Sequence, residues 1–102
     1  MSAAPFFIGI DLGTGSCKSV VVGETGRVLG FGVGEYGSAG AGGRWQEQAP
    51  SGLLSGTVGS VRAALGQAGV APVHCAGLSV GGALHSVMAV DGRDNPLTGV
   101  IT

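Results

Sequence analysis

One segment of the sequence, residues 6–18, constrains the fold most strongly. Its apolar residues 6–10 form a short aromatic and β-branched run that ends at Asp11, and a loop rich in glycine and hydroxyl side chains follows. A second β-branched run, residues 20–22, begins soon after this loop, so the segment predicts two strands joined by a tight turn. The loop fits neither the G-x-x-x-x-G-K-[ST] pattern nor a G-x-G-x-x-G between a strand and a helix.

The loop carries the groups that are needed to bind the terminal phosphates of a nucleotide. Glycines allow a sharp turn and bring backbone N–H groups close to an anion. Hydroxyls add donors, a lysine adds charge, and a carboxylate can hold a divalent metal directly or through water. The candidates are Asp11 for the metal and Gly13, Thr14, Gly15, Ser16 and Lys18 for phosphate. A glycine-rich hairpin with a half-buried aspartate explains the same spacing equally well, because short glycine motifs often occur by chance.

Composition bounds the function classes. The chain has 102 residues, 44% of them hydrophobic and 11% charged, with a net charge of −1, which predicts one ordered domain or part of one. It has no basic patch, so nucleic acid is not expected as a partner. Its apolar runs are too short to span a bilayer and its N-terminus carries no basic signal, so no membrane association is expected. We expect Cys17 and Cys75 to be free thiols in a reducing cytoplasm.

The hydrophobic pattern predicts an α/β chain in the order of three strands, a helix, a strand and a hairpin. A helix is expected to begin at Pro50 or Ser51 and to end at Gly69. The expected strands are 6–11, 17–23, 27–36, 75–80, 87–90 and 97–102, with a loop at 37–44 and a turn at 91–96. We expect strand 75–80 to be buried. An apolar stripe on the helix is expected from Leu53, Leu54, Val58, Val61 and Leu65.

The hairpin resembles the first phosphate motif of the superfamily of actin, heat-shock chaperones and sugar kinases. Within that superfamily, four segments resemble the N-terminal end of the FGGY carbohydrate kinases, which include xylulokinase, gluconokinase and glycerol kinase. They are residues 9–18, 44–48, 76–79 and 84–92, the last followed by Pro96 and Leu97. The segments occur in family order and at family spacing over essentially the whole chain.

The resemblance implies two ribonuclease-H-like domains around a deep cleft, each beginning βββαβ. In the family, sugar binds mainly to the first domain and ATP mainly to the second, which also carries the aspartate that acts as catalytic base. Residues 1–102 would then be a truncated N-terminal domain without the C-terminal ATP-binding domain. The isolated chain is therefore expected to be inactive, with the missing C-terminal half of the same enzyme as its partner.

The resemblance also implies roles for the loop residues, with ATP and Mg²⁺ as cofactors. Asp11 would coordinate Mg²⁺, usually through water, and face the junction between sugar and phosphate. The hydroxyls of Thr14 and Ser16, with the amides of Gly13 and Gly15, would hold the γ-phosphate. Lys18 matches a cation that can neutralise the same oxygens, although an exposed strand lysine explains it equally well.

Two further residues, Leu84 and His85, stand where the family places a Met-His pair that contacts the sugar. The surrounding run looks more like gluconokinases than xylulokinases, so a gluconate-type acid is the first expected substrate among sugars and sugar acids. A loop histidine bonded to a backbone carbonyl is the alternative for His85. Trp45 is interpreted as a packing residue rather than a sugar-stacking one, and Tyr36 is assigned no chemistry.

Three rival functions remain open at this point. One is another kinase of the superfamily, of the acetate or hexose type. A second is a nucleotide switch similar to actin or the chaperones, without sugar chemistry. The third is a small binding module that self-associates through the unfinished sheet edge at residues 99–102, which reads as a strand without a cap.

Overall fold

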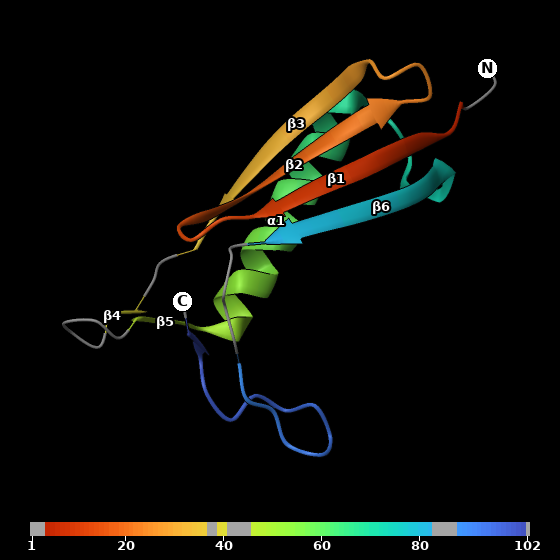
Figure 1. Cartoon of the computed structure of the whole chain (residues 1–102). Coiled ribbons are helices and arrows are strands. Elements are labelled where there is room, and N and C mark those ends of the chain that lie inside the picture. The colour runs from red at the N-terminus through yellow and green to blue at the C-terminus, as the bar shows by residue number, and fades with distance from the viewer. Residues whose placement is uncertain (1–3, 37–38, 41–45, 83–87, 102) are drawn as a thin grey trace.

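The fold is a mixed four-stranded sheet with one long helix against one face (Figure 1). The computed structural model describes residues 4–36, 39–40, 46–82 and 88–101. The strands of this sheet are β1 (Phe6–Leu12), β2 (Ser16–Gly23), β3 (Val28–Glu35) and β6 (Cys75–Gly82). They lie in the order β3-β2-β1-β6, with β1, β2 and β3 antiparallel and β6 parallel to β1. The predicted α/β order of three strands, a helix and a further strand is confirmed.

Helix α1 (Pro50–Ala68) begins and ends at the predicted signals. Pro50 lies at the first helical position, where its missing N–H breaks no intrahelical bond. Gly69 ends the helix in the left-handed conformation with a φ of 69°, and its N–H donates to the carbonyl of Leu65 at 2.9 Å. The short helix η1 (Pro72–His74) then leads into β6. Among the described residues, no helix is long and apolar enough to cross a membrane.

The face that α1 turns to the sheet differs from the predicted stripe. Its buried residues are small, namely Gly56, Ser60 and Ala64. Leu54 and Val58, by contrast, are 67% and 38% exposed, so the prediction was wrong for them. Val61 and Leu65 are partly buried against the core, as the stripe predicted.

Three glycines of β3 explain this choice. Gly30, Gly32 and Gly34 are buried under α1, and a Cβ at any of them would lie within 3 Å of helix backbone atoms. The backbone of α1 therefore packs directly against the backbone of β3, which is possible only because the facing residues are small. Larger side chains such as Leu54 are excluded from this interface by its closeness.

The core lies between β1, β2 and α1. Phe6, Ile8 and Val21 pack with Ala64, and a buried polar cluster lies beside them. In that cluster the hydroxyls of Ser19 and Ser60 are 2.6 Å apart, and Ser60 also donates to the sulfur of Cys17 at 3.3 Å. Cys17 is fully buried, and both it and Cys75 are free thiols, as predicted.

Strand β6 is not buried, contrary to the prediction. Leu78 and Val80 are 62% and 54% exposed, because α1 packs mainly on β3 and β2.

A second, three-stranded sheet lies beyond the end of the first. Its strands are β4 (Ala39–Gly40), β5 (Gln46–Gln48) and β7 (Val100–Ile101), in the order β4-β5-β7. β4 falls within the segment predicted to be a loop, and the predicted strand 97–102 is reduced to β7. Its pairing partner is β5 rather than a neighbouring hairpin strand, and such a non-local pairing leaves no local sequence signal.

The predicted strand 87–90 is not formed in its described part. Residues 88–90 contribute only an isolated bridge between Val90 and Pro96. The two backbone bonds of this bridge run from the Asp91 and Leu97 N–H groups to the carbonyls of Asn95 and Ala89, at 2.9 and 2.8 Å. The ladder goes no further, because the Ala89 N–H donates to the Thr98 hydroxyl at 3.2 Å. The predicted turn at 91–96 is confirmed, since the Asp91 carboxylate accepts bonds from the backbone N–H groups of Arg93 and Asn95 at 2.8 and 3.0 Å.

Candidate functional site

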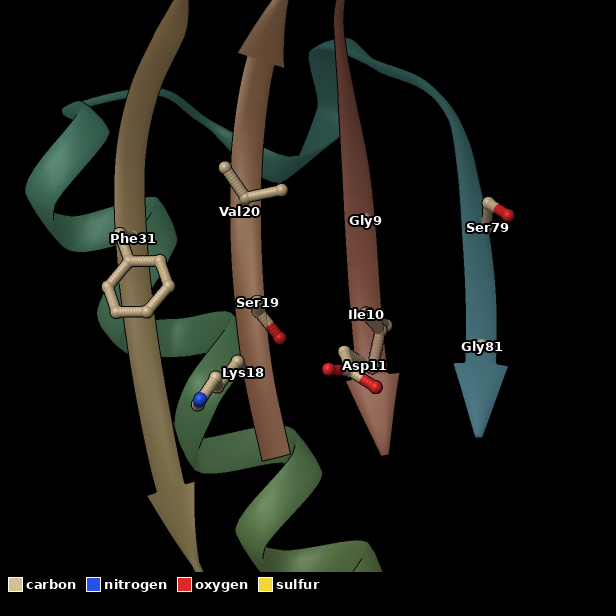
Figure 2. A pocket seen from close by; sticks show the side chains of 9 residues that line it. All are labelled: Gly9, Ile10, Asp11, Lys18, Ser19, Val20, Phe31, Ser79 and Gly81. Atoms are coloured by element: carbon tan, nitrogen blue, oxygen red, sulfur yellow. The ribbon is translucent and has the colours of Figure 1, made fainter. Parts of the chain in front are cut away.

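Asp11 and Lys18 form the charged centre of the candidate site. Asp11 lies near the end of β1, directly opposite Lys18 on the antiparallel strand β2. Residues that lie directly opposite each other project from the same face of a sheet. Asp11 and Lys18 therefore share one face, which is the face that α1 does not cover. Both side chains are exposed, and Figure 2 shows the carboxylate and the ammonium group on that face.

The two charges line a hollow of about 340 Å³ on the open face of the sheet, which we call the Asp11 hollow. All four strands of the main sheet contribute to its lining. Its residues are Gly9, Ile10, Asp11, Lys18, Ser19, Val20, Phe31, Ser79 and Gly81 (Figure 2). Because two of these residues are glycines, the floor beside Asp11 is bare backbone, which leaves room for a ligand against the carboxylate.

The predicted phosphate loop is a tight hairpin between β1 and β2. The Gly13 N–H donates to the Ser16 carbonyl at 2.9 Å and closes it. A Cβ at Gly13 would lie 2.8 Å from that carbonyl oxygen, so the closure requires glycine there, whereas a Cβ at Gly15 would meet nothing within 4 Å. Thr14 and Gly15 form the exposed tip. In the closed hairpin the Gly13 N–H is bonded to the Ser16 carbonyl and cannot also donate to a phosphate.

Tyr36 is the residue of this site that the sequence analysis missed. It follows β3 and is buried, and its hydroxyl lies 2.5 Å from the Gly13 carbonyl oxygen and 3.0 Å from that of Ser16. Its backbone N–H donates to the Gly15 carbonyl at 3.2 Å. A signal was available, because Tyr36 continues the alternation of Gly30, Gly32 and Gly34 and therefore belongs to the face of β3 that α1 covers.

Asp11 could bind a magnesium ion if the phosphate oxygens of a nucleotide and water supplied the other ligands. Among the described residues there is no group of three or more His, Cys, Asp or Glu side chains that could hold a metal. Mg²⁺ needs no such cage, since it is commonly held by one or two carboxylates, phosphate oxygens and retained water. The exposed Asp11 carboxylate beside an open hollow suits that mode of binding.

The structure brings Asp11, the loop 13–16 and Lys18 together at the end of the sheet where β1 ends and β2 begins. The other predicted site residues, Leu84 and His85, lie outside the described residues, as does Trp45. Their roles remain predictions.

Residues 6–102 match the N-terminal domain of the FGGY family of carbohydrate kinases, and the chain is a member of that family. No curated protein sequence is significantly similar to the chain.

Solved structures with the same fold include several kinases. A gluconate kinase from Lactobacillus acidophilus aligns with a TM-score of 0.87 at 20% identity, over 98% of this chain and 20% of that one. A xylulose kinase from Rhodospirillum rubrum aligns with a TM-score of 0.81 at 22% identity, over 93% and 20% of the two chains. A xylulose kinase from Bifidobacterium adolescentis aligns with a TM-score of 0.72 at 27% identity, over 96% and 17%. The chain thus spans about a fifth of the length of these structures or less.

Proposed function

We propose that this chain is the N-terminal, sugar-side part of an ATP-dependent carbohydrate kinase, whose ATP-binding domain and catalytic base lie in a C-terminal part beyond residue 102. The observation that carries the proposal is the joint placement of Asp11, the glycine hairpin 13–16 and Lys18 at one end of the sheet. Family membership supports it independently.

The proposed roles follow from charge and position. Transfer of a phosphoryl group depends mainly on positioning and on neutralising the charge spread over its oxygens. Asp11 holds Mg²⁺, which supplies positive charge at the phosphate oxygens. The hydroxyls of Thr14 and Ser16 and the amide of Gly15 orient the γ-phosphate, and the Gly13 amide can join them only where the hairpin opens. Lys18 neutralises part of the phosphate charge.

The test is ADP release by the complete protein with MgATP and a panel of gluconate, xylulose, ribulose and glycerol. We expect turnover with one of them, and Asp11→Asn is expected to reduce kcat about 100-fold or more. Glu24→Gln is the matched control, because Glu24 is an exposed carboxylate at the opposite end of β2 from the loop. Sugar turnover that survives Asp11→Asn would contradict the role proposed for Asp11. ATP-dependent assembly with no sugar turnover would contradict the kinase proposal and favour a nucleotide switch.

For the substrate we propose a gluconate-type sugar acid, bound in part by Leu84 and His85. The run around His85 supports this by its resemblance to gluconokinases. We expect His85→Ala to raise the KM for the sugar acid about tenfold through a lost hydrogen bond, while His74→Ala, on η1, leaves it unchanged. A preference for xylulose in the panel would refute the substrate class.

The 102-residue chain alone is proposed to be inactive and to self-associate. Phe7, Phe31 and Val33 are 44%, 48% and 46% exposed, an apolar surface that a partner would cover. We expect no ADP release from the isolated chain and a concentration-dependent size in exclusion chromatography. A monomer at every concentration would disprove the self-association.

A further inference from the structure

The backbone carbonyls of the phosphate loop converge on Tyr36, the residue that follows β3. Gly13 and Ser16 direct their carbonyl oxygens at the Tyr36 hydroxyl, at 2.5 and 3.0 Å. The Gly15 carbonyl accepts the Tyr36 backbone N–H at 3.2 Å. The hydroxyl has a single proton, which it donates to one of its two carbonyl neighbours or shares between them. Tyr36 therefore bonds to the loop on both sides of its tip.

Fixing these carbonyls also fixes the amides that follow them. A trans peptide is planar and directs its N–H opposite to its C=O. With the Gly13 carbonyl turned toward the Tyr36 hydroxyl, the Thr14 N–H of the same peptide points away from that hydroxyl. Turning a loop carbonyl inward in this way directs the following N–H outward, which is the arrangement that binds anions in loops of this kind.

Tyr36 is itself held in place by helix α1. The residue is only 5% exposed, and a Cβ added at Gly56 would lie 2.6 Å from the Tyr36 Cδ1 atom. The ring thus lies against bare helix backbone and has no room to shift toward it. Burial, followed by electrostatic interaction with Cys17 and Asp11, raises the pKa of the Tyr36 hydroxyl above its ordinary value, and the hydroxyl is a donor at neutral pH.

We propose that Tyr36 is a positioning residue of the phosphate loop, which holds the loop carbonyls inward so that the loop's donors face the phosphates of ATP. The proposal rests on the kinase function proposed above. It assigns to Gly56 the role of leaving space for the Tyr36 ring, so the loop is supported through β3 by helix α1.

The test compares three variants of the complete protein. Tyr36→Phe removes the hydroxyl and keeps the ring, Gly56→Ala displaces the ring, and Gly59→Ala makes the same change where a Cβ meets nothing within 4 Å. We expect Tyr36→Phe and Gly56→Ala to lower kcat/KM for MgATP about five- to tenfold, with the KM for the sugar unchanged. Hydrogen–deuterium exchange of the peptide containing residues 13–16 is expected to accelerate in both. Gly59→Ala should match the unmodified protein in both readouts.

Two outcomes separate this proposal from the proposed function. If Tyr36→Phe leaves both the loop exchange and kcat/KM for MgATP unchanged, the positioning role is overturned. If the unmodified protein turns over no sugar, the kinase function is refuted, and loop exchange alone then decides whether Tyr36 anchors the hairpin. A loss that affects sugar and ATP equally, with unchanged loop exchange, would also overturn the proposal, because it indicates a general structural effect.

Discussion

Replacing Gly32 with alanine tests the close packing of α1 on β3. The new Cβ would lie 2.7 Å from the Ala64 nitrogen and 2.9 Å from the Ala63 Cβ, and closer still to the Ser60 carbonyl oxygen. Ordinary contact begins at 3.4 Å, so the Ala64 nitrogen alone requires the helix to withdraw by 0.7 Å, the difference between 3.4 and 2.7 Å, and the nearer Ser60 oxygen requires more. Backbone atoms cannot rotate away as a side chain can, so the strain falls on the whole interface.

The expected cost combines two effects. Overpacking of a well-packed core costs about 1–3 kcal/mol. Withdrawal of the helix also stretches the buried 2.6 Å contact between the hydroxyls of Ser19 and Ser60, which is worth about 1 kcal/mol. We therefore expect Gly32→Ala to lower the free energy of unfolding by about 3 kcal/mol.

Urea unfolding of the 102-residue chain, followed by circular dichroism, measures this change. The control is Gly66→Ala on the same helix, where a Cβ meets nothing within 4 Å. Since alanine favours a helix over glycine, this variant should gain about 0.5–1 kcal/mol. Thiol labelling of Cys17, which is fully buried beneath α1, should accelerate in Gly32→Ala only. Equal stabilities for the two variants would refute the close-packing argument.

Three further predictions concern the loop and two titrating groups. Gly13→Ala should destabilise the chain and Gly15→Ala should not, as measured by thermal unfolding, because only the first new Cβ meets the Ser16 carbonyl, at 2.8 Å. Burial is the first cause that raises the pKa of Tyr36 in the folded chain above the value of 10.0 in the unfolded chain. The contribution of the protonated hydroxyl to the free energy of unfolding is therefore fully present below pH 10.0 and is lost as pH rises through the folded-state pKa. Absorbance of the phenolate checks this in a chain with a single tyrosine, and a folded-state midpoint at or below 10.0 would contradict it. Backbone N–H groups of Asn95 and Arg93, together with the Asn95 side chain, lower the pKa of Asp91 below 3.8. The turn should therefore hold above pH 3.8 and open as pH falls through the lowered value, and Asp91→Ala should open it at neutral pH, with the amide chemical shifts of Arg93 and Asn95 as the measurement.

Much of the sheet could be predicted because its signals are local. The β-branched run of β2, the glycine loop before it and the proline and glycine at the ends of α1 each specify an element within a few residues. The candidate cluster of Asp11, loop 13–16 and Lys18 could be predicted for the same reason, since one hairpin carries all of it.

The rest depends on partners that are distant in sequence. The buried face of α1 is set by Gly30, Gly32 and Gly34 on another element, so a helical apolar stripe alone selects the wrong residues. The exposure of β6 depends on which strands α1 covers. The contacts of the Tyr36 hydroxyl depend on a loop that lies 20 residues earlier in the sequence. Periodicity within one segment predicts the face on which a residue lies, but not the distant residue that it contacts.

The close contact between α1 and β3 has a genetic consequence. A side chain added on one element can usually be accommodated when a second mutation shortens its neighbour. At Gly32 the nearest obstructing atoms are the Ser60 carbonyl oxygen and the Ala64 nitrogen, which belong to the main chain and which no codon change removes. A screen for second-site suppressors of Gly32→Ala should therefore recover reversion to glycine or distant, generally stabilising changes, and no compensating substitution at the contact itself.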